Sequence, residues 1–365
     1  MMDTSPLSKE QIEILIEAGA RAPSGGNMQP WIVATHAYGI RVSLDEKRSC
    51  ASWFLDVDRY ASIFALGCFV ENVSLKASSL GLRSDVRVKE GKETKDFSCE
   101  VVFHHTGSPS DQVLADTIPI RTTNRRFFDG TLIAGELLQK LQSVLQKEKV
   151  PVLLHTIYEE TDKKTLARML ADADGIRMTK EEPFSQMMHE FRWSKDEVVQ
   201  TKDGLDLATL ELPGNAEQML RLLRSFQFTR KMLPRQALGD FTKPLLLGCS
   251  HLCCLAVDAP VTQSSIFAAG RQAERVWLKA TALGLAFHPW TTLVFFLLRL
   301  KLLHGEGFSL SEKKELASLD GKFREVFGLE QSETPVFLFR LSYANPPTAR
   351  ALRLPVNAFT TFAKE

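Results

Sequence analysis

Two stretches of the chain share nearly the same pattern of small and apolar positions at helical spacing. Residues 62–82 have the sequence SIFALGCFVENVSLKASSLGL and residues 265–285 have SIFAAGRQAERVWLKATALGL; at a constant offset of 203, thirteen of the 21 positions are identical. Each copy ends in Leu-Gly-Leu, with Gly81 or Gly284 where a helix C-terminal cap is favoured. Because small side chains let helix axes approach closely, the repeat predicts two buried core helices packed about a pseudo-twofold axis.

Helix and strand patterns alternate around both copies of the repeat. An amphipathic helix is predicted at 7–22, opening with Ser8 as its N-cap. The alternation predicts an α+β or α/β fold with helices packed on a central sheet. The remaining predicted elements are strands at 31–37, 40–44, 84–89, 98–105, 151–158, 253–259 and 334–342, and helices at 134–146 and 162–173.

The two halves differ in length at one place. Their first helices align at an offset near 126, whereas the core helices align at 203, so about 75 extra residues lie between roughly 175 and 250. We therefore divide the chain into a first half, 1–118, and a second half, 119–365, that carries the insertion. The Met, Phe and Trp residues of the insertion suit either a helical pair that covers the core or a lid over a ligand.

Composition narrows the class of protein without naming it. The chain has 365 residues, 45 basic against 44 acidic, a net charge of +1 and 44% apolar residues. This balance is typical of a globular protein and offers no basic excess for nucleic acid. The most hydrophobic run, 293–298, is interrupted by Arg299 and Lys301 well short of the ~20 residues that span a bilayer. With no signal-peptide pattern at the start, we expect a cytoplasmic protein without a membrane segment.

One cysteine-rich run raises the question of a metal site. Cys249, His251 and Cys253 could in principle touch one ion, but no second ligand pair occurs elsewhere in the chain. The surrounding sequence LLLGCSHLCCLAVDAP is typical of a buried strand, and free cysteine is among the most buried residue types. We favour the strand and predict no metal.

A loop near the N-terminus is too rich in special residues for a plain turn. It has the sequence Ala-Pro-Ser-Gly-Gly-Asn-Met-Gln-Pro-Trp over residues 22–31, between a helix and a strand. Ser24 and Asn27 offer side-chain hydrogen bonds, while Gly25 and Gly26 let backbone amides approach a ligand. We interpret it as a ligand-contacting loop rather than a structural turn.

A second segment and the C-terminal tail supply arginines. Residues 120–128 have the sequence IRTTNRRFF, in which fork-shaped guanidinium groups alternate with hydroxyls, as a phosphate requires. A solvated charged face is the alternative, but flanking apolar residues on both sides argue for an anchored segment. Arg350 and Arg353 lie in the tail TARALRLPVNAF.

Together, the loop APSGGNMQPW, the segment RTTNRRF, the stretch LKATALGLAFHPW and the tail RLPVNAF resemble the nitroreductase superfamily of FMN-dependent oxidoreductases. Two copies in one chain, the wording RTTNRRF and the insertion look like the Acg-type branch of that superfamily. The resemblance implies an α+β fold of two fused pseudo-symmetric halves, with mostly antiparallel sheets flanked by helices around a buried helical core. It also implies FMN as cofactor, NAD(P)H as electron donor and a small-molecule substrate.

The family's site residues carry over by position. By resemblance Arg121 meets the FMN phosphate with Arg353, Thr123 meets the ribityl chain or phosphate, and Arg125 lies near the pyrimidine end of the flavin, where it would stabilise charge near N1. No acid–base residue is required, and we assign no catalytic residue. The full set expected to contact the cofactor is Pro23, Ser24, Gly25, Asn27, Gln29, Arg121, Thr123, Asn124, Arg125, Pro289, Trp290, Thr291, Arg350 and Arg353.

Two positions qualify the resemblance. His288 falls beside the family's flavin-edge segment, where a lone histidine is more often structural. In many family enzymes a Glu-Gly pair follows the proline that ends this strand, whereas here Pro289 is followed by Trp290 and Thr291. The departure puts nicotinamide selection and reactivity in question.

The asymmetry of the halves predicts one cofactor per chain. The first half has no arginine cluster before its first helix, and the second has QKEKVPVLL where the Gly-Gly loop would stand. One composite site is therefore complete, and its mate lacks both parts. We expect a monomer that mimics a dimer, or a weak homodimer.

Three functions fit these features. The first is NAD(P)H-dependent reduction of a nitroaromatic or quinone through FMN. The second is an FMN storage or sensing protein whose insertion closes the site, with little reductase activity. The third is a structural protein that has lost its flavin.

Overall fold

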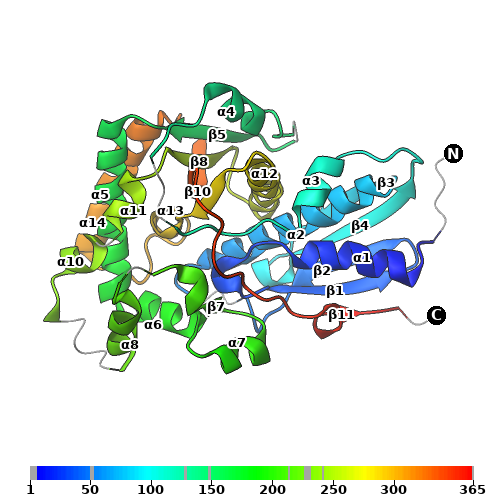
Figure 1. Ribbon diagram of the computed structural model, residues 1–365, viewed down its shortest axis with the longest axis horizontal. Helices are drawn as coiled ribbons and strands as arrows, with labels where there is room; N and C mark the ends of the chain where they lie inside the picture. The colour runs from blue at the N-terminus through cyan, green and yellow to red at the C-terminus, as the bar shows by residue number, and fades with distance from the viewer. Residues whose placement is uncertain are drawn as a thin grey trace.

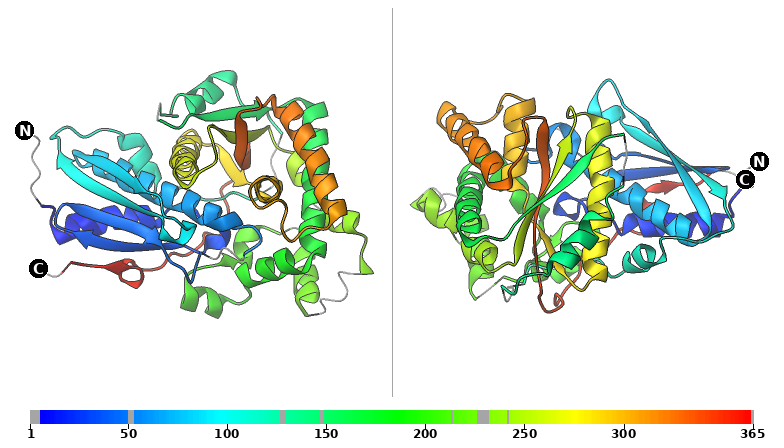
Figure 2. Two further views of the ribbon diagram at one scale, coloured as in Figure 1. Left: turned by 180° about the vertical axis from the view of Figure 1, so that it is seen from behind. Right: turned by 90° about the horizontal axis from the view of Figure 1, so that it is seen from above.

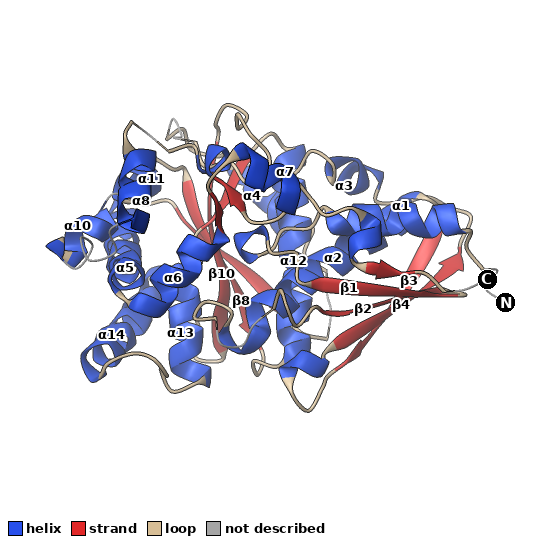
Figure 3. Ribbon diagram, turned by 90° about the horizontal axis from the view of Figure 1, so that it is seen from below, coloured by secondary structure: helices blue, strands red, loops and turns tan. Residues whose placement is uncertain are grey.

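The computed structural model describes residues 6–49, 53–126, 130–146, 149–212, 214–225, 232–240 and 242–363. One sheet lies at one end of the molecule and the other near its middle, with long helices between the sheets and further helices beyond the second one (Figure 1; Figure 3). The termini of the chain lie at the same end, beyond the first sheet. Phe127, Phe128 and Cys50, which belong to the sequence motifs, fall outside the described residues.

The first sheet has the strand order β11-β1-β2-β4-β3. Its antiparallel part consists of β1 (Trp31–His36), β2 (Gly39–Leu44), β3 (Leu82–Lys89) and β4 (Ser98–His105), close to the predicted spans. Helix α1 (Lys9–Ala20) packs beside it and begins as predicted, because Ser8 and Gln11 form a capping box.

The second sheet repeats this plan. Its order is β5-β8-β10-β9, formed by β5 (Val152–Ile157), β8 (His251–Asp258), β9 (Ala286–Pro289) and β10 (Glu333–Ser342), all antiparallel. Strands β5, β8, β10 and β9 thus occupy the places of β1, β2, β4 and β3, and α4 (Gly135–Gln142) takes the place of α1. The predicted α+β class with two pseudo-symmetric halves is confirmed.

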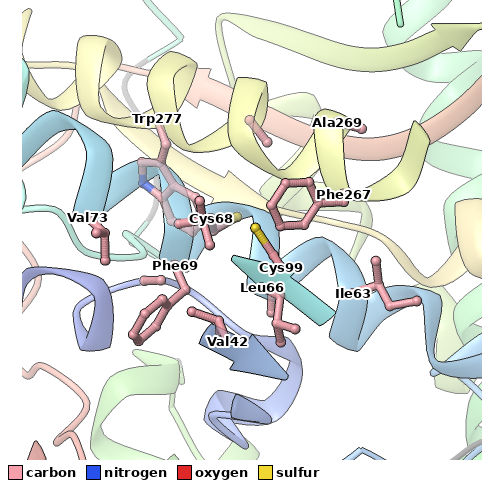
Figure 4. Close-up of a cluster of buried hydrophobic side chains, with 14 of the residues drawn as sticks. Val42, Ile63, Leu66, Cys68, Phe69, Val73, Cys99, Phe267, Ala269 and Trp277 are labelled. Atoms are coloured by element: carbon pink, nitrogen blue, oxygen red, sulfur yellow. The ribbon is translucent and has the colours of Figure 1, made fainter. Parts of the chain in front are cut away.

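The two core helices cross at a glycine in each helix. They are α2 (Tyr60–Ser79) and α12 (Gln263–Ala282). A Cβ on Gly67 would lie 2.2 Å from the Phe267 carbonyl oxygen, and one on Gly270 would lie 2.0 Å from the Phe64 carbonyl oxygen. Each of these pairs is the image of the other at the offset of 203, so the crossing point lies on the predicted pseudo-twofold axis. Figure 4 shows Phe267 and Trp277 of α12 in the same buried cluster as Cys68 of α2.

The repeated glycines at the helix ends behave as predicted. Gly81 has φ 75° and Gly284 has φ 74°, in the left-handed region that ends a helix with least strain in glycine. The chain then turns directly into β3 or β9.

The long insertion lies between β5 and β8, which corrects its predicted start. It begins after Ile157 rather than near residue 175, because α5 (Glu160–Thr179) is part of it and the counterpart strands β1 and β2 are joined by a short turn. Its further elements are α6 (Glu181–Glu190), β6 (Phe191–Arg192), α7 (Lys195–Thr201), β7 (Leu205–Asp206), η4 (Leu207–Leu210), α8 (Ala216–Ser225), α10 (Arg235–Asp240) and α11 (Lys243–Leu247).

Three α-helices outside the insertion were not predicted. They are α13 (Thr292–Leu302) and α14 (Leu310–Phe327), which lie between β9 and β10, and α3 (Gln112–Thr117). The apolar run at 293–298 belongs to α13 and is largely buried. No helix in the described part of the chain has the length and apolarity to cross a membrane.

The C-terminal tail leaves the second half and joins the first. After β10 it runs along the molecule and adds β11 (Thr360–Thr361) in parallel to β1, as the red trace shows in both views of Figure 2. The chain thereby links the halves once through residues 106–134 and again through this tail.

The cysteine-rich run is a buried strand, as predicted. Strand β8 is buried along seven of its eight residues, and Cys249, Cys253 and Cys254 are free thiols beneath the surface. Burial raises the pKa of Cys249 to about 11, so this thiol stays protonated at neutral pH.

Candidate functional site

A cavity of about 500 Å³ lies between the two halves, within the size range of small-molecule sites. Segments that are distant in sequence meet in its wall, among them the Gly-Gly loop, the start of α2, the arginine segment, the end of β9 and the C-terminal tail. Most of the expected cofactor residues meet here: Pro23, Ser24, Gly25, Asn27, Arg121, Thr123, Arg125, Pro289, Trp290, Thr291, Arg350 and Arg353.

The Gly-Gly loop is held in an unusual backbone conformation. Gly26, Asn27 and Gln29 have φ values of 55°, 55° and 54°; asparagine adopts the left-handed region more readily than most residues, but glutamine seldom does. Such strain persists where the surrounding structure imposes it, and it concentrates at ligand sites. A Cβ on Gly26 would lie 2.7 Å from Glu190 Cγ, whereas a Cβ on Gly25 would meet nothing within 4 Å. Gly26 is therefore required for packing, and Gly25 leaves open space beside the cavity.

Asn27 joins the loop to two other segments. Its Nδ2 donates to the carbonyl oxygens of Gly204 (3.0 Å) and Leu352 (3.2 Å), and its Oδ1 accepts from Arg353 Nη1 at 2.8 Å. All the polar atoms of this buried side chain are thus satisfied by protein, which makes Asn27 a positioning residue for Arg353.

Positive charge gathers at one end of the cavity. Arg353 donates to the carbonyl oxygen of Ala22, and Arg121 Nη2 donates to that of Arg21 at 2.6 Å. Burial and the neighbouring guanidinium groups of Arg121 and Arg21 lower the pKa of Arg353 to about 9. Guanidinium groups thus lie close together here, and an anion bound among them would relieve their repulsion.

One carboxylate partly balances this charge. Arg121 Nε lies 3.1 Å from Glu274 Oε1, and the Arg121 guanidinium lies 4.6 Å from the centre of the Trp277 ring. Burial raises the pKa of Glu274 to about 7, although Arg121 opposes the shift. Arg121 is consequently fixed in orientation, while Arg353 and Arg125 have no carboxylate within 4.0 Å among the described residues.

The other end of the arginine segment reaches the insertion. Arg125 Nη1 donates to the Thr209 carbonyl oxygen at 3.0 Å, and burial lowers the pKa of Arg125 to about 10. Thr123 lines the cavity beside it.

Two expected residues do not line the cavity. The Gln29 side chain is fully buried; its Nε2 donates to the Lys202 carbonyl oxygen and its Oε1 accepts from the Leu354 amide. Asn124 Nδ2 donates to the Asn345 carbonyl oxygen, and the backbone N–H of Asn124 donates to the Phe287 carbonyl oxygen. Both hold the segments that carry the site.

The segment after β9 forms the wall opposite the loop. Trp290 Nε1 donates to Asp174 Oδ2 at 3.2 Å, and the Trp290 amide donates to the Leu338 carbonyl oxygen. His288 Nδ1 accepts from Arg340 Nε at 3.0 Å, and burial holds the pKa of this histidine well below its usual value. His288 is thus a neutral acceptor in a buried pair, which agrees with the structural role expected for it.

The insertion covers the cavity and is fastened to the motifs around it. The residues of the insertion that line the cavity include Gln186, Met187, Glu190, Phe191, Leu205, Thr209, Leu210, Glu211, Leu212 and Leu220. Arg48 Nη1 donates to Asp203 Oδ2 at 2.7 Å, and Arg192 Nη2 lies 2.5 Å from Asp203 Oδ1. We call residues 181–212, which contain most of these cavity-lining positions, the lid.

The counterpart of the Gly-Gly loop is bonded to the second core helix. In that segment, the Val144 carbonyl oxygen accepts from Arg275 Nε at 3.1 Å, and the Gln146 amide donates to Gln272 Oε1 at 2.8 Å. Arg275 Nη1 also pairs with Glu71 at 2.5 Å. Polar side chains of α12 therefore bond to protein groups at the place that corresponds to the first site.

Several cavity residues escaped the sequence motifs. Phe64 and Phe337 stack with ring centres 4.9 Å apart in its wall, and Asp56 and Trp277 also line it. Trp277 had a detectable signal, because the repeat has serine at the equivalent position, 74. Asp56 had none, since its place depends on contacts distant in sequence.

The N-terminal segment of the chain matches the model of a known protein family. Residues 2–47 match the model of the nitroreductase family, and this span includes the Gly-Gly loop. The predicted resemblance to the nitroreductase superfamily is thereby confirmed, while the Acg-type branch remains a prediction.

An uncharacterised protein of Mycobacterium tuberculosis, MT1398, is 26% identical over 344 residues, which make up 93% of this chain and 47% of that protein. The chain thus spans about half the length of this curated relative.

Solved structures also resemble the chain at low sequence identity. The FMN-dependent nitroreductase NfnB from Mycobacterium smegmatis, in complex with NADPH, has 15% identity and a TM-score of 0.39, covering 69% of this chain and 99% of its own. A nitroreductase with bound FMN from Desulfitobacterium hafniense has 11% identity and a TM-score of 0.37, with coverage of 69% and 99%. The NADPH:FMN oxidoreductase of Vibrio harveyi has 13% identity and a TM-score of 0.34, with coverage of 67% and 75%.

Proposed function

We propose that the whole chain is a fused member of the nitroreductase superfamily that binds one FMN in the cavity between its halves. The observation that carries this proposal is the cluster of guanidinium groups around Arg353 beside a cavity of about 500 Å³, next to the loop for which the family model matches. Guanidinium forks are suited to a phosphate, and the aromatic walls suit a planar ring system.

The residues present fit FMN at both ends. Arg353, Arg350 and Arg121 would hold the phosphate, with Ser24 and Asn27 in the facing loop. Thr123 would lie along the ribityl chain, and Arg125 would reach the pyrimidine end. Pro289, Trp290 and Thr291 would border the ring. When bound, FMN supplies hydride transfer between a nicotinamide and an acceptor.

The chain's own residues then perform three tasks in this proposal. The arginines orient the phosphate, Arg125 stabilises negative charge on the reduced ring, and the lid excludes water. The donor is NAD(P)H, and the acceptor is a small molecule such as a nitroaromatic or a quinone. The bonds at the counterpart of the Gly-Gly loop support one FMN per chain and a monomer that mimics a dimer. Nothing in the near-neutral charge favours a nucleic-acid partner.

A second candidate function is favoured by the lid. Asn27 and Arg125 both bond to lid backbone, at Gly204 and Thr209, so the lid contacts the same residues that would hold FMN. A protein that stores or senses FMN under a closed lid, with little reductase activity, would show this arrangement.

Anaerobic stopped-flow mixing separates the two candidates. The FMN-loaded protein is mixed with NADH or NADPH, and the loss of flavin absorbance is followed. Reduction within seconds supports the oxidoreductase. An absorbance that stays unchanged for minutes with both nucleotides, while a lid variant such as Asp203→Asn is reduced, supports storage or sensing. A purified protein that takes up no FMN contradicts both.

A further inference from the structure

Asp56 is a carboxyl group in the cavity wall that has no part in holding FMN in the proposal above. Its side chain lies just before α2, and the residue is 5% exposed. Ser62 Oγ donates to Asp56 Oδ2 at 2.6 Å, and the Ser62 amide donates to Oδ1 at 3.0 Å. Because Asp56 and Ser62 both line the cavity, a molecule bound there can reach this pair.

The backbone next to Asp56 is strained. Asp58 and Arg59 follow it with φ values of 46° and 59°, although neither is a glycine. Two successive left-handed residues cost on the order of 1–3 kcal/mol each. The chain therefore keeps this turn at an energetic cost, and the turn brings Asp56 back to the first turn of α2.

The surroundings of Asp56 shift its pKa in opposite directions. Burial raises its pKa to about 6, whereas the hydrogen bonds from Ser62 and the charge of Arg59 favour the carboxylate. Two ion pairs also lie near this wall: Glu190 of α6 lies 3.7 Å from Arg177 of α5, and Arg48 binds Asp203. The pKa of Glu190 is itself raised, chiefly by burial and in part by Asp56.

We propose that Asp56 is the acid that protonates the electron acceptor, and that Ser62 stabilises the carboxylate left behind. This inference rests on the proposed function. Reduction of a quinone to a hydroquinone adds one hydride and one proton; the reduced flavin supplies the hydride. The O–H bond of the Asp56 carboxyl breaks as a new O–H bond forms on the acceptor oxygen, and the carboxylate regains its proton from water. The acceptor class is therefore one that needs a proton with its electrons, such as quinones and nitro compounds.

The test compares two acceptors in the oxidative half-reaction alone. The FMN-loaded protein is photoreduced without nucleotide and then mixed anaerobically with 1,4-benzoquinone or with ferricyanide, which takes an electron and no proton. Asp56→Asn should be about 100-fold slower with benzoquinone, because general acids contribute at least this much, and unchanged with ferricyanide. Asp58→Asn is the matched control, since Asp58 is two residues away, bonds to Thr94 and does not line the cavity.

The pH dependence has a defined sign. Because the protonated form donates, the wild-type rate with benzoquinone should be high below about pH 6 and fall above it. Ser62→Ala removes the side-chain hydrogen bond that favours the carboxylate and keeps the backbone one, so it should move the midpoint to higher pH. Infrared difference spectra provide a readout without turnover: a protonated-carboxyl band that disappears near pH 6 in wild type and Asp58→Asn should be missing in Asp56→Asn.

Two results would overturn the inference while leaving the flavin chemistry intact. One is an Asp56→Asn variant with the wild-type benzoquinone rate and pH profile. The other is equal slowing with both acceptors, which would show a structural effect. A wild-type protein that binds no FMN would instead overturn the proposed function and this inference with it.

Discussion

Replacing Arg353 by methionine separates phosphate binding from ring binding. The side chain makes hydrogen bonds to Asn27, Ala22 and Leu352, and its positive charge has no carboxylate partner within 4.0 Å among the described residues. Methionine keeps the length of the side chain and removes its charge and its donors. We expect the variant to fold, because Arg353 is only partly buried and lies in the tail.

The size of the effect follows from the bonds that a phosphate would lose. A hydrogen bond to a charged group contributes about 1.5–3 kcal/mol, and each 1.4 kcal/mol changes a dissociation constant tenfold. Arg353→Met should therefore weaken FMN binding by about 10- to 100-fold. Arg353→Lys keeps a point charge but not the fork and should fall between the variant and wild type.

Quenching of flavin fluorescence provides the assay, with riboflavin as the internal control. Riboflavin lacks the phosphate, so its affinity should be nearly the same in wild type and in Arg353→Met. Arg126→Met is the matched control, because Arg126 donates to the Pro346 carbonyl oxygen and does not line the cavity. Equal weakening of FMN and riboflavin, or no weakening of either, would refute the phosphate assignment.

Two further predictions concern the helix crossing and the lid. Gly270→Ala should lower the free energy of unfolding by about 1–3 kcal/mol, because its Cβ would overlap the Phe64 carbonyl oxygen. Gly25→Ala is the control and should change the free energy of unfolding far less, because its Cβ would meet open space. Equal denaturation midpoints for the two variants would contradict the close crossing of the helices. Burial raises the pKa of Asp203, but Arg192 and Arg48 lower it further, so that the pKa lies below its usual value. The ion pairs of Asp203 with Arg48 and Arg192 should therefore be present at neutral pH and weaken as the pH falls through the pKa of Asp203 in the folded protein. Limited proteolysis of the lid should accelerate on acidification in wild type and be fast at all pH values in Asp203→Asn. A wild-type cleavage rate that does not change with pH would contradict the role of Asp203 in holding the lid.

The sequence was most informative where a feature is local or repeated. The core helices, their Leu-Gly-Leu ends and the pseudo-twofold axis follow from periodicity, because a helical face and a C-terminal glycine are determined within a few residues. The asymmetric motifs likewise located one site, and twelve of the fourteen expected residues line one cavity.

What the sequence did not predict depends on contacts between distant segments. Gln29 has the composition of a ligand-contacting residue, but Lys202 and Leu354 use both ends of its side chain. The insertion has no counterpart in the first half, so the alignment of the two halves could not predict that it lies beside the Gly-Gly loop. The position of Asp56 follows from two left-handed residues in a turn without glycine, and no local pattern predicts such a turn.

The number of flavins per chain tests the central claim most directly. The purified chain is saturated with FMN, freed of excess and examined by native mass spectrometry. Our account predicts one chain with one FMN, because Arg275 and Gln272 bond to protein groups at the place that corresponds to the first site. Two FMN per chain, or FMN held only by a dimer of chains, would contradict it.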